Sequence, residues 1–215
     1  MIRVMMMMAI KQSPKVLTEH EKKIITNIFQ SCGFEMNALT DIFGIRLNDS
    51  FTNHFDDMIC QIVKNDQGEW ILFAWPATTD PGKYYLLNPM RESGCAILKP
   101  GQYVDAYELG LHFKQEALIQ VENVSVYRVI QKNPENLKYE YDEKTVETGV
   151  FVINIHGPFG DAEEIGKKSA GCQVFMKDAD RKEFIENCKW IKEKYNLKRF
   201  TYTLFSEKLL KGAKL

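Results

Sequence analysis

Short β-rich runs separated by turn-forming residues fill most of this chain, and they limit the possible folds more than any other feature. The runs "MICQIV", "EWILFAW" and "YYLLN" follow one another, divided by "NDQG" and "TTDPGK". The first two predict a hairpin, because Asn65, Asp66 and Gly68 tolerate the positive φ that tight turns need. Four further runs predict strands at 95–98, 117–121, 124–130 and 149–155. This spacing favours a mostly antiparallel barrel or sandwich.

Two amphipathic helices are predicted, one on each side of the β-rich region. The first starts with a capping box, in which Thr18 is followed three residues later by Glu21. Asp180 and Glu183 predict the start of the second helix in the same way. Each helix has an apolar stripe, formed by Ile24, Ile25, Ile28 and Phe29 in the first and by Phe184, Cys188, Ile191 and Tyr195 in the second. The run "RFTYTLF" predicts a final strand.

These elements give a fold class that is mainly β with flanking helices (α+β). We expect an N-terminal helical extension over residues 1–42, a single β-rich domain over 43–205 and a loose C-terminal tail over 206–215. The polar, highly charged stretch 131–149 predicts an exposed loop or an extended hairpin.

Charge and cysteine content argue against several kinds of partner. Lys and Arg number 28 against 29 Asp and Glu, so no nucleic-acid partner is expected. Five scattered cysteines without a C-x-x-C pair argue against a disulfide framework and a zinc finger. No metal and no other cofactor is expected. Four of the thiols are interpreted as structural: Cys32, Cys60, Cys95 and Cys188.

The N-terminal sequence "MIRVMMMMAI" resembles a signal peptide only superficially. It lacks a small-residue cleavage site, and its apolar run is short. No stretch approaches the roughly 18 apolar residues needed to span a bilayer, so a transmembrane protein is not expected. We expect synthesis in the cytoplasm, and the sequence leaves open whether the protein acts at the cell envelope after release or delivery.

The stretch "INIHGPFGDAEEIGKKSAGCQVF" carries the strongest chemical signal. His156 and Cys172 lie sixteen positions apart on either side of a turn-rich segment. A cysteine nucleophile needs a nearby base, so this pair predicts nucleophilic catalysis with a depressed thiol pKa. Gly171 permits a tight turn beside the thiol, and backbone N–H groups at Cys172 are candidate oxyanion donors. The alternative is that Cys172 is an ordinary core residue.

The same residues resemble the catalytic motif of the L,D-transpeptidase (YkuD-like) family. The matching positions are His156-Gly157 and Ser169-Ala170-Gly171-Cys172, and they suggest a diverged branch similar to phage and Bacteroidetes proteins with an INIH…SAGCQ motif. The resemblance implies that Cys172 is the nucleophile, that His156 is the base and that the Gly157 carbonyl orients the imidazole. It also implies that Ser169 supports the turn, and Ser169, Ala170 and Gly171 together are the candidate turn and oxyanion support. Ala170 and Val174 stand where the family usually has polar side chains.

The resemblance implies a β-rich L,D-transpeptidase-like fold and peptidoglycan stem peptides as the partner. A thioester at Cys172 would pass the acyl group to an amine or to water, and the sequence does not choose between these acceptors. The alternatives are a catalytically silent wall-binding or virion structural module, which Ala170 and Val174 favour, and a peptide hydrolase unrelated to the cell wall.

Four further residues are candidate substrate contacts. His112 is a candidate replacement for the second histidine of the family motif, although a structural role is the more common one. Gln102 and Tyr103 follow a Pro-Gly turn and are candidates to project into the cleft. Asn154 lies two residues before His156 on the same strand face, which also makes it a candidate to orient the imidazole. A metal cluster of His54, Asp56 and Asp57 is disfavoured.

Overall fold

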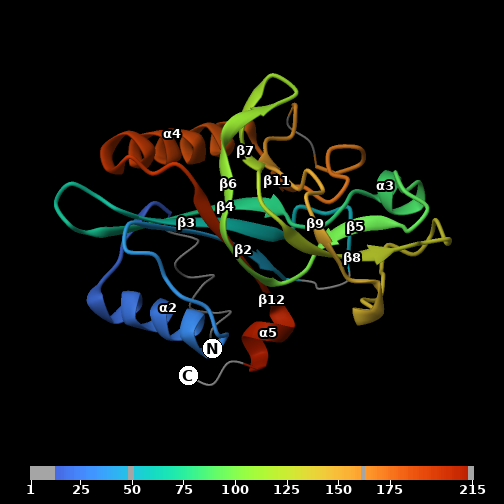
Figure 1. Ribbon diagram of the computed structural model, residues 1–215, viewed down its shortest axis with the longest axis horizontal. Coiled ribbons are helices and arrows are strands. Elements are labelled where there is room, and N and C mark those ends of the chain that lie inside the picture. Colours follow the sequence, from blue (N-terminus) through green and yellow to red (C-terminus); the bar gives the residue numbers. More distant parts are fainter. Residues whose placement is uncertain (1–12, 48–50, 161–162, 213–215) are drawn as a thin grey trace.

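The computed structural model describes residues 13–47, 51–160 and 163–212, and it is mainly β (Figure 1). Its strands in chain order are β1 (Lys15–Val16), β2 (Thr40–Arg46), β3 (Asp57–Lys64), β4 (Trp70–Thr78), β5 (Cys95–Leu98), β6 (Gly101–His112), β7 (Gln115–Gln120), β8 (Val124–Val129), β9 (Glu147–Gly149), β10 (Ile155–His156), β11 (Gln173–Phe175) and β12 (Phe200–Ser206). The helices are α2 (Glu19–Ser31), α3 (Lys83–Leu87), α4 (Asp178–Tyr195) and α5 (Glu207–Gly212), with a 3-10 turn η1 (Glu143–Thr145). The predicted β-rich fold with a few helices is confirmed.

The larger sheet closes into a barrel. The strands run in the order β4, β11, β10, β7, β6, β12, β2 and β3, and β3 pairs with β4 to complete the ring. Most neighbours are antiparallel, whereas β10 with β11 and β12 with β2 are parallel. A second sheet of β5, β8 and β9 lies at one side of the barrel (Figure 1). The predicted choice between a barrel and a sandwich is thus decided in favour of a barrel.

Helices α2 and α4 cover opposite faces of the strands β2 and β3 (Figure 1). Alternate residues of a strand point to opposite faces. Ile42 and Ile59 belong to the core cluster that includes the apolar stripe of α4. Their neighbours Phe43 and Cys60 pack with α2 and Phe29. Because both faces are buried, these strands have near-continuous apolar sequences.

Local signals predicted several elements correctly. The Thr18 side chain caps α2, and Glu21 completes the capping box. Strands β3 and β4 form the predicted hairpin, with Gly68 at a φ of 82°. The second long helix is also present, but its N-cap is Lys177, three residues before the predicted N-cap Asp180, and the helix begins at Asp178.

The prediction of a strand at "YYLLN" is wrong. These residues lie in and directly after α3, where the Leu86 N–H donates to the Gly82 carbonyl and the Asn88 N–H donates to that of Tyr84. Leu86 is buried in a cluster with Cys95 of β5. Burial of this side chain outweighs the β preference of the adjacent aromatic residues.

The predicted strand 149–155 is interrupted. β9 ends at Gly149, and β10 contains only Ile155 and His156. Between them, the N–H groups of Phe151 and Ile153 both donate to the side-chain oxygen of Gln120, at 3.1 and 2.9 Å. A side chain therefore replaces a neighbouring strand as the hydrogen-bond partner of this segment.

The predicted borders of the β-rich domain do not coincide with the ends of the observed helices and strands. β2 begins at Thr40 and crosses the border predicted after residue 42, and residues 1–12 lie outside the described part of the chain. The expected loose tail contains α5, whose Leu210 is buried against the cluster that holds α2. Within the described ranges, no helix combines the length and apolar character needed to cross a membrane.

Candidate functional site

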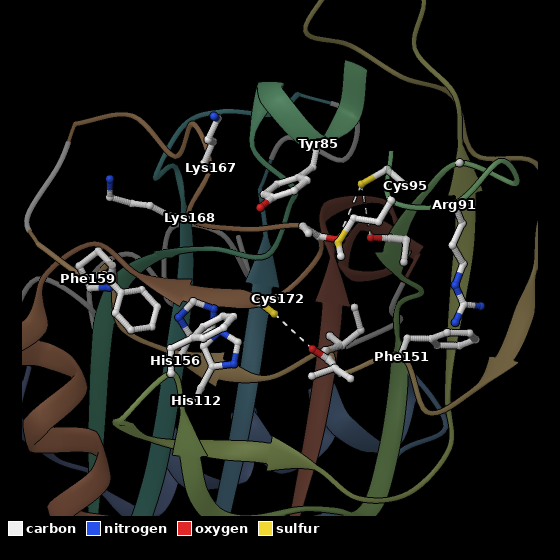
Figure 2. A pocket seen from close by; sticks show the side chains of 18 of the residues that line it. Tyr85, Arg91, Cys95, His112, Phe151, His156, Phe159, Lys167, Lys168 and Cys172 are labelled. Atoms are coloured by element: carbon white, nitrogen blue, oxygen red, sulfur yellow. Dashed lines mark hydrogen bonds between the residues drawn. The ribbon is translucent and has the colours of Figure 1, made fainter. Parts of the chain in front are cut away.

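The parallel pairing of β10 with β11 places His156 and Cys172 close together. Ile155 is opposite Gln173 and His156 is opposite Val174, so Cys172 comes directly before the paired segment. The Gln173 N–H also donates to the Asn154 carbonyl at 2.9 Å and extends the pairing toward Cys172. Both His156 and Cys172 line one cavity of about 690 Å³ (Figure 2).

The His156 imidazole is held in one tautomer. Nδ1 lies 2.6 Å from the Gly157 carbonyl oxygen, which can only accept, so the ring proton is on Nδ1. Nε2 is buried and has no hydrogen-bond partner among the described residues. Burial, followed by the proximity of His112, lowers the pKa of His156 to about 3. Nε2 is consequently an uncharged lone pair, which is the form that a general base requires. Gly157 makes the contact that the family resemblance implies, and its catalytic role stays a prediction.

The Cys172 thiol is mostly buried, with 8 % of the residue exposed. It donates a hydrogen bond to the Val152 carbonyl, with 3.3 Å between Sγ and O. Burial raises the pKa of this thiol to about 11. The prediction of a depressed pKa is therefore wrong for the ligand-free protein, because burial outweighs the other effects on the thiol and the neighbouring imidazole is neutral.

The turn before Cys172 is fixed by Ser169 and Gly171. The Ser169 hydroxyl donates to the Cys172 carbonyl at 2.8 Å and accepts from the Gly171 N–H at 3.1 Å. Gly171 has a φ of 125°, and a Cβ at this position would lie 2.2 Å from the Ala96 carbonyl oxygen. The missing side chain thus allows β5 to approach the turn. Ala170, between these two residues, lines the cavity.

His112 lies against His156, at the end of β6. The two rings are stacked with centroids 4.2 Å apart, and His112 also lines the cavity. The Asn154 amide donates to His112 Nδ1 at 3.0 Å, and its oxygen accepts from the Gln120 N–H at 2.9 Å. Asn154 therefore contacts His112, while the His156 ring is oriented by the Gly157 carbonyl.

Gln102 and Tyr103 do not lie where the sequence predicted them. The Gln102 amide binds the backbone of Glu35 and the hydroxyl of Thr203. The Tyr103 hydroxyl donates to the carbonyls of Lys99 and Ser125. Neither is among the described residues that line the cavity, so the prediction that they contact substrate there is corrected.

Several residues of the cavity wall were missed by sequence reasoning. They come from separate segments, namely Tyr85, Met90, Arg91, Cys95, Phe113, Phe151 and Phe159. Phe159 is the one that the sequence signalled, since it follows His156 by three residues, and its ring lies 5.5 Å from the imidazole. Phe151 also lies near the motif, five residues before His156, whereas Tyr85, Met90, Arg91, Cys95 and Phe113 are far from it in sequence.

Three residues of the cavity wall have left-handed backbone conformations without being glycine. Phe113, Val152 and Phe159 have φ angles of 45°, 62° and 56°. This conformation is most unusual for a β-branched residue such as Val152. The Val152 carbonyl is the acceptor of the thiol, so the unusual conformation directs an oxygen atom at Cys172. Such conformations cluster at functional sites.

The raised pKa predicts a slow and strongly pH-dependent reaction of Cys172 with iodoacetamide. Because the thiolate is the nucleophile, alkylation is expected to be slower than that of glutathione at about pH 7 and to rise about tenfold per pH unit up to about pH 9. Mass spectrometry of the Cys172 peptide measures this rate, and circular dichroism over the same range checks that the fold persists. A rate that levels off below about pH 8 would show a depressed pKa instead.

The described residues contain no group of three or more His, Cys, Asp or Glu side chains arranged to hold a metal ion. Comparison of the chain with protein-family models, with curated proteins and with solved structures finds no match.

Proposed function

We propose that this protein is a cysteine-dependent acyltransferase or hydrolase that acts on peptidoglycan stem peptides through a thioester at Cys172. One observation carries the proposal: a thiol and a neutral imidazole face the same cavity, and the imidazole Nε2 has no hydrogen-bond partner among the described residues. The closed β-barrel with few helices is consistent with an L,D-transpeptidase-like fold, and the resemblance of the His156 and Cys172 motif supplies the substrate class.

The proposed reaction starts from two neutral groups. The Cys172 thiol leaves the Val152 carbonyl and transfers its proton to His156 Nε2 as sulfur attacks the substrate carbonyl carbon. The C–N bond then breaks, and the leaving amine takes the proton from His156. An acceptor amine, or water, attacks the resulting thioester and gives up a proton to His156. That proton returns to sulfur when the C–S bond breaks, so the thiol is regenerated.

A catalytically silent binding module is the second candidate. The raised thiol pKa and the hydrogen bond from Cys172 to Val152, rather than to His156, favour it. Val174, which stands at a usual polar position of the family motif, is buried and opposite Thr78 of β4, so it offers no group to a substrate.

Replacing Cys172 by alanine is expected to lower stem-peptide turnover at least about a thousandfold, because no other group in the site forms the thioester. Mass spectrometry of peptidoglycan fragments, with and without a D-amino acid acceptor, measures cleavage and exchange. Cys95→Ala is the matched control, since Cys95 lines the same cavity but has no histidine partner in the proposal.

Turnover that survives in Cys172→Ala contradicts the cysteine mechanism. A wild-type protein that binds cell wall without turnover, with binding unchanged in Cys172→Ser, selects the silent module. Cleavage of ordinary L-peptides in preference to stem peptides contradicts the proposed substrate class.

A further inference from the structure

The charged side chains of the described residues that line the cavity at Cys172 are all positive. Its described wall contains four cationic side chains, Arg91, Arg128, Lys167 and Lys168, and no Asp or Glu. The whole chain is nearly neutral, with 28 basic and 29 acidic residues. The cavity therefore differs in charge from the average of the protein, and it attracts anions.

Three of these cations are not neutralised by an acidic side chain of the described residues. Arg128 is paired, since its guanidinium lies 2.8 Å from Glu147. Lys167 lies over the Tyr84 ring, with 4.2 Å between Nζ and the ring centroid, and this contact leaves its charge uncompensated. Arg91 and Lys168 have no side-chain ion pair within the described chain. These three charges remain available for a ligand.

The three cations lie on two sides of the thiol (Figure 2). Lys167 and Lys168 are on the side of His156 and Phe159, and Arg91 is on the side of Phe151. Cys172 lies between them. A substrate carbonyl placed at the sulfur would thus have positive charge in both directions along the bound chain.

The space between the charges is largely apolar. Phe151 and Val152 line one part of the cavity, and Phe113 and Phe159 line another. Phe113 and Val152 are exposed to solvent by 82 % and 58 %, so they offer apolar surface that a ligand can cover. This wall suits the carbon chain of a ligand, whereas the cations suit its charged groups.

We propose that the acyl donor of this site is an anionic peptide with carboxylates on both sides of the reacting carbonyl, one bound by Lys167 and Lys168 and the other by Arg91. This inference rests on the proposed function, because it places the reacting carbonyl at Cys172. Ammonium and guanidinium groups form charge-assisted hydrogen bonds with carboxylates, and such contacts select between charged and neutral ligands.

Binding to full-length Cys172→Ala protein tests the inference without turnover. The probes are a synthetic stem-type tetrapeptide with both flanking carboxylates free, its two mono-amides and its diamide, measured by calorimetry. The diacid is expected to bind at least about tenfold more tightly than the diamide at low salt, and this advantage is expected to shrink at about 0.5 M NaCl.

Charge variants locate the two contacts. Arg91→Gln, and Lys167→Gln together with Lys168→Gln, are each expected to weaken binding of the diacid and to leave the diamide unaffected. Each mono-amide lacks one of the two carboxylates. Its binding is therefore expected to be unaffected by the variant that removes the cationic partner of that missing carboxylate. Lys23→Gln on the exposed side of α2 is the matched control and is expected to change nothing.

Equal affinity for diacid and diamide overturns the inference, and so does the absence of binding by either peptide or an equal effect of Lys23→Gln. Turnover measurements distinguish a failure of this inference from a failure of the proposed function. Equal turnover of diacid and diamide by the wild type keeps the cysteine chemistry and rejects the anionic donor. A salt-sensitive preference for the diacid without any turnover keeps the anion site and rejects the chemistry.

Discussion

Replacing Arg46 by methionine is expected to lower the free energy of unfolding by about 3–5 kcal/mol. Arg46 ends β2 and is fully buried. Its Nε lies 3.0 Å from Asp80, and its Nη atoms donate to the carbonyls of Leu98 and Thr79 at 3.0 and 2.6 Å. The guanidinium therefore joins the barrel to the end of β5.

The cost arises from the groups that Arg46 leaves behind. Burial raises the pKa of the carboxyl groups of Asp80 and Asp57, and Arg46 opposes that rise. Without the guanidinium, two buried acidic groups lose their cation, and the carbonyls of Leu98 and Thr79 lose a donor.

Urea denaturation followed by circular dichroism measures the change. Arg199→Met is the matched control, because Arg199 pairs with Glu122 at the surface, and such pairs contribute about 0–1 kcal/mol. Adding Asp80→Asn to Arg46→Met is expected to recover part of the loss by removing one buried acid. Equal losses for Arg46→Met and Arg199→Met would contradict the role given to this network.

Replacing Gly171 by alanine is expected to lower the free energy of unfolding by about 3 kcal/mol or more. Two effects combine at this position. The φ of 125° is unfavourable for a residue with a side chain, and the new Cβ would lie 2.2 Å from the backbone oxygen of Ala96. Because backbone on both sides must move, the turn that holds Cys172 is displaced, and turnover is expected to fall with stability.

A glycine without the clash provides the comparison. Gly33 has a φ of 77°, and a Cβ there would have no neighbour within 4 Å, so Gly33→Ala tests backbone strain alone and is expected to cost about 1–2 kcal/mol. Thermal unfolding and the stem-peptide assay measure both variants. A Gly171→Ala protein that is as stable as Gly33→Ala would show that β5 can move away from the turn.

Elements with strong local signals could be predicted from the sequence. The capping box of Thr18 and Glu21 and the Gly68 turn depend on neighbouring residues, and both are present. The helix at "YYLLN" was missed because it depends on burial of Leu86 against β5. The pairing of β11 with β4, which the barrel also needs, joins residues almost one hundred positions apart and has no local signal.

In the candidate site, too, the residues that are close in sequence could be predicted and those brought together by the fold could not. His156, Gly157, Ser169, Gly171 and Cys172 lie in one short stretch, so their proximity could be expected from the sequence. The part of the wall formed by residues 85–96, 113 and 128 could not be, because the fold brings these distant segments to the motif.

The state of the thiol also depends on that assembly. Burial raises the pKa of the thiol, and the thiol donates to the Val152 carbonyl, whose unusual φ no residue pattern indicated. Gln102 was misplaced for a similar reason, since its partner Glu35 is 67 residues away.

The parallel pairing of β10 and β11 fixes the positions of His156 and Cys172, so these positions do not depend on the length of the segment that joins them. The pairing of Ile155 with Gln173 fixes the register. Extra residues inserted after the exposed Gly160 would lengthen the connection without shifting that register, and doubling a loop costs only about 0.6 kcal/mol in closure entropy. The connection is thus a natural place for evolution, or for protein engineering, to add residues while His156 and Cys172 keep their relative placement.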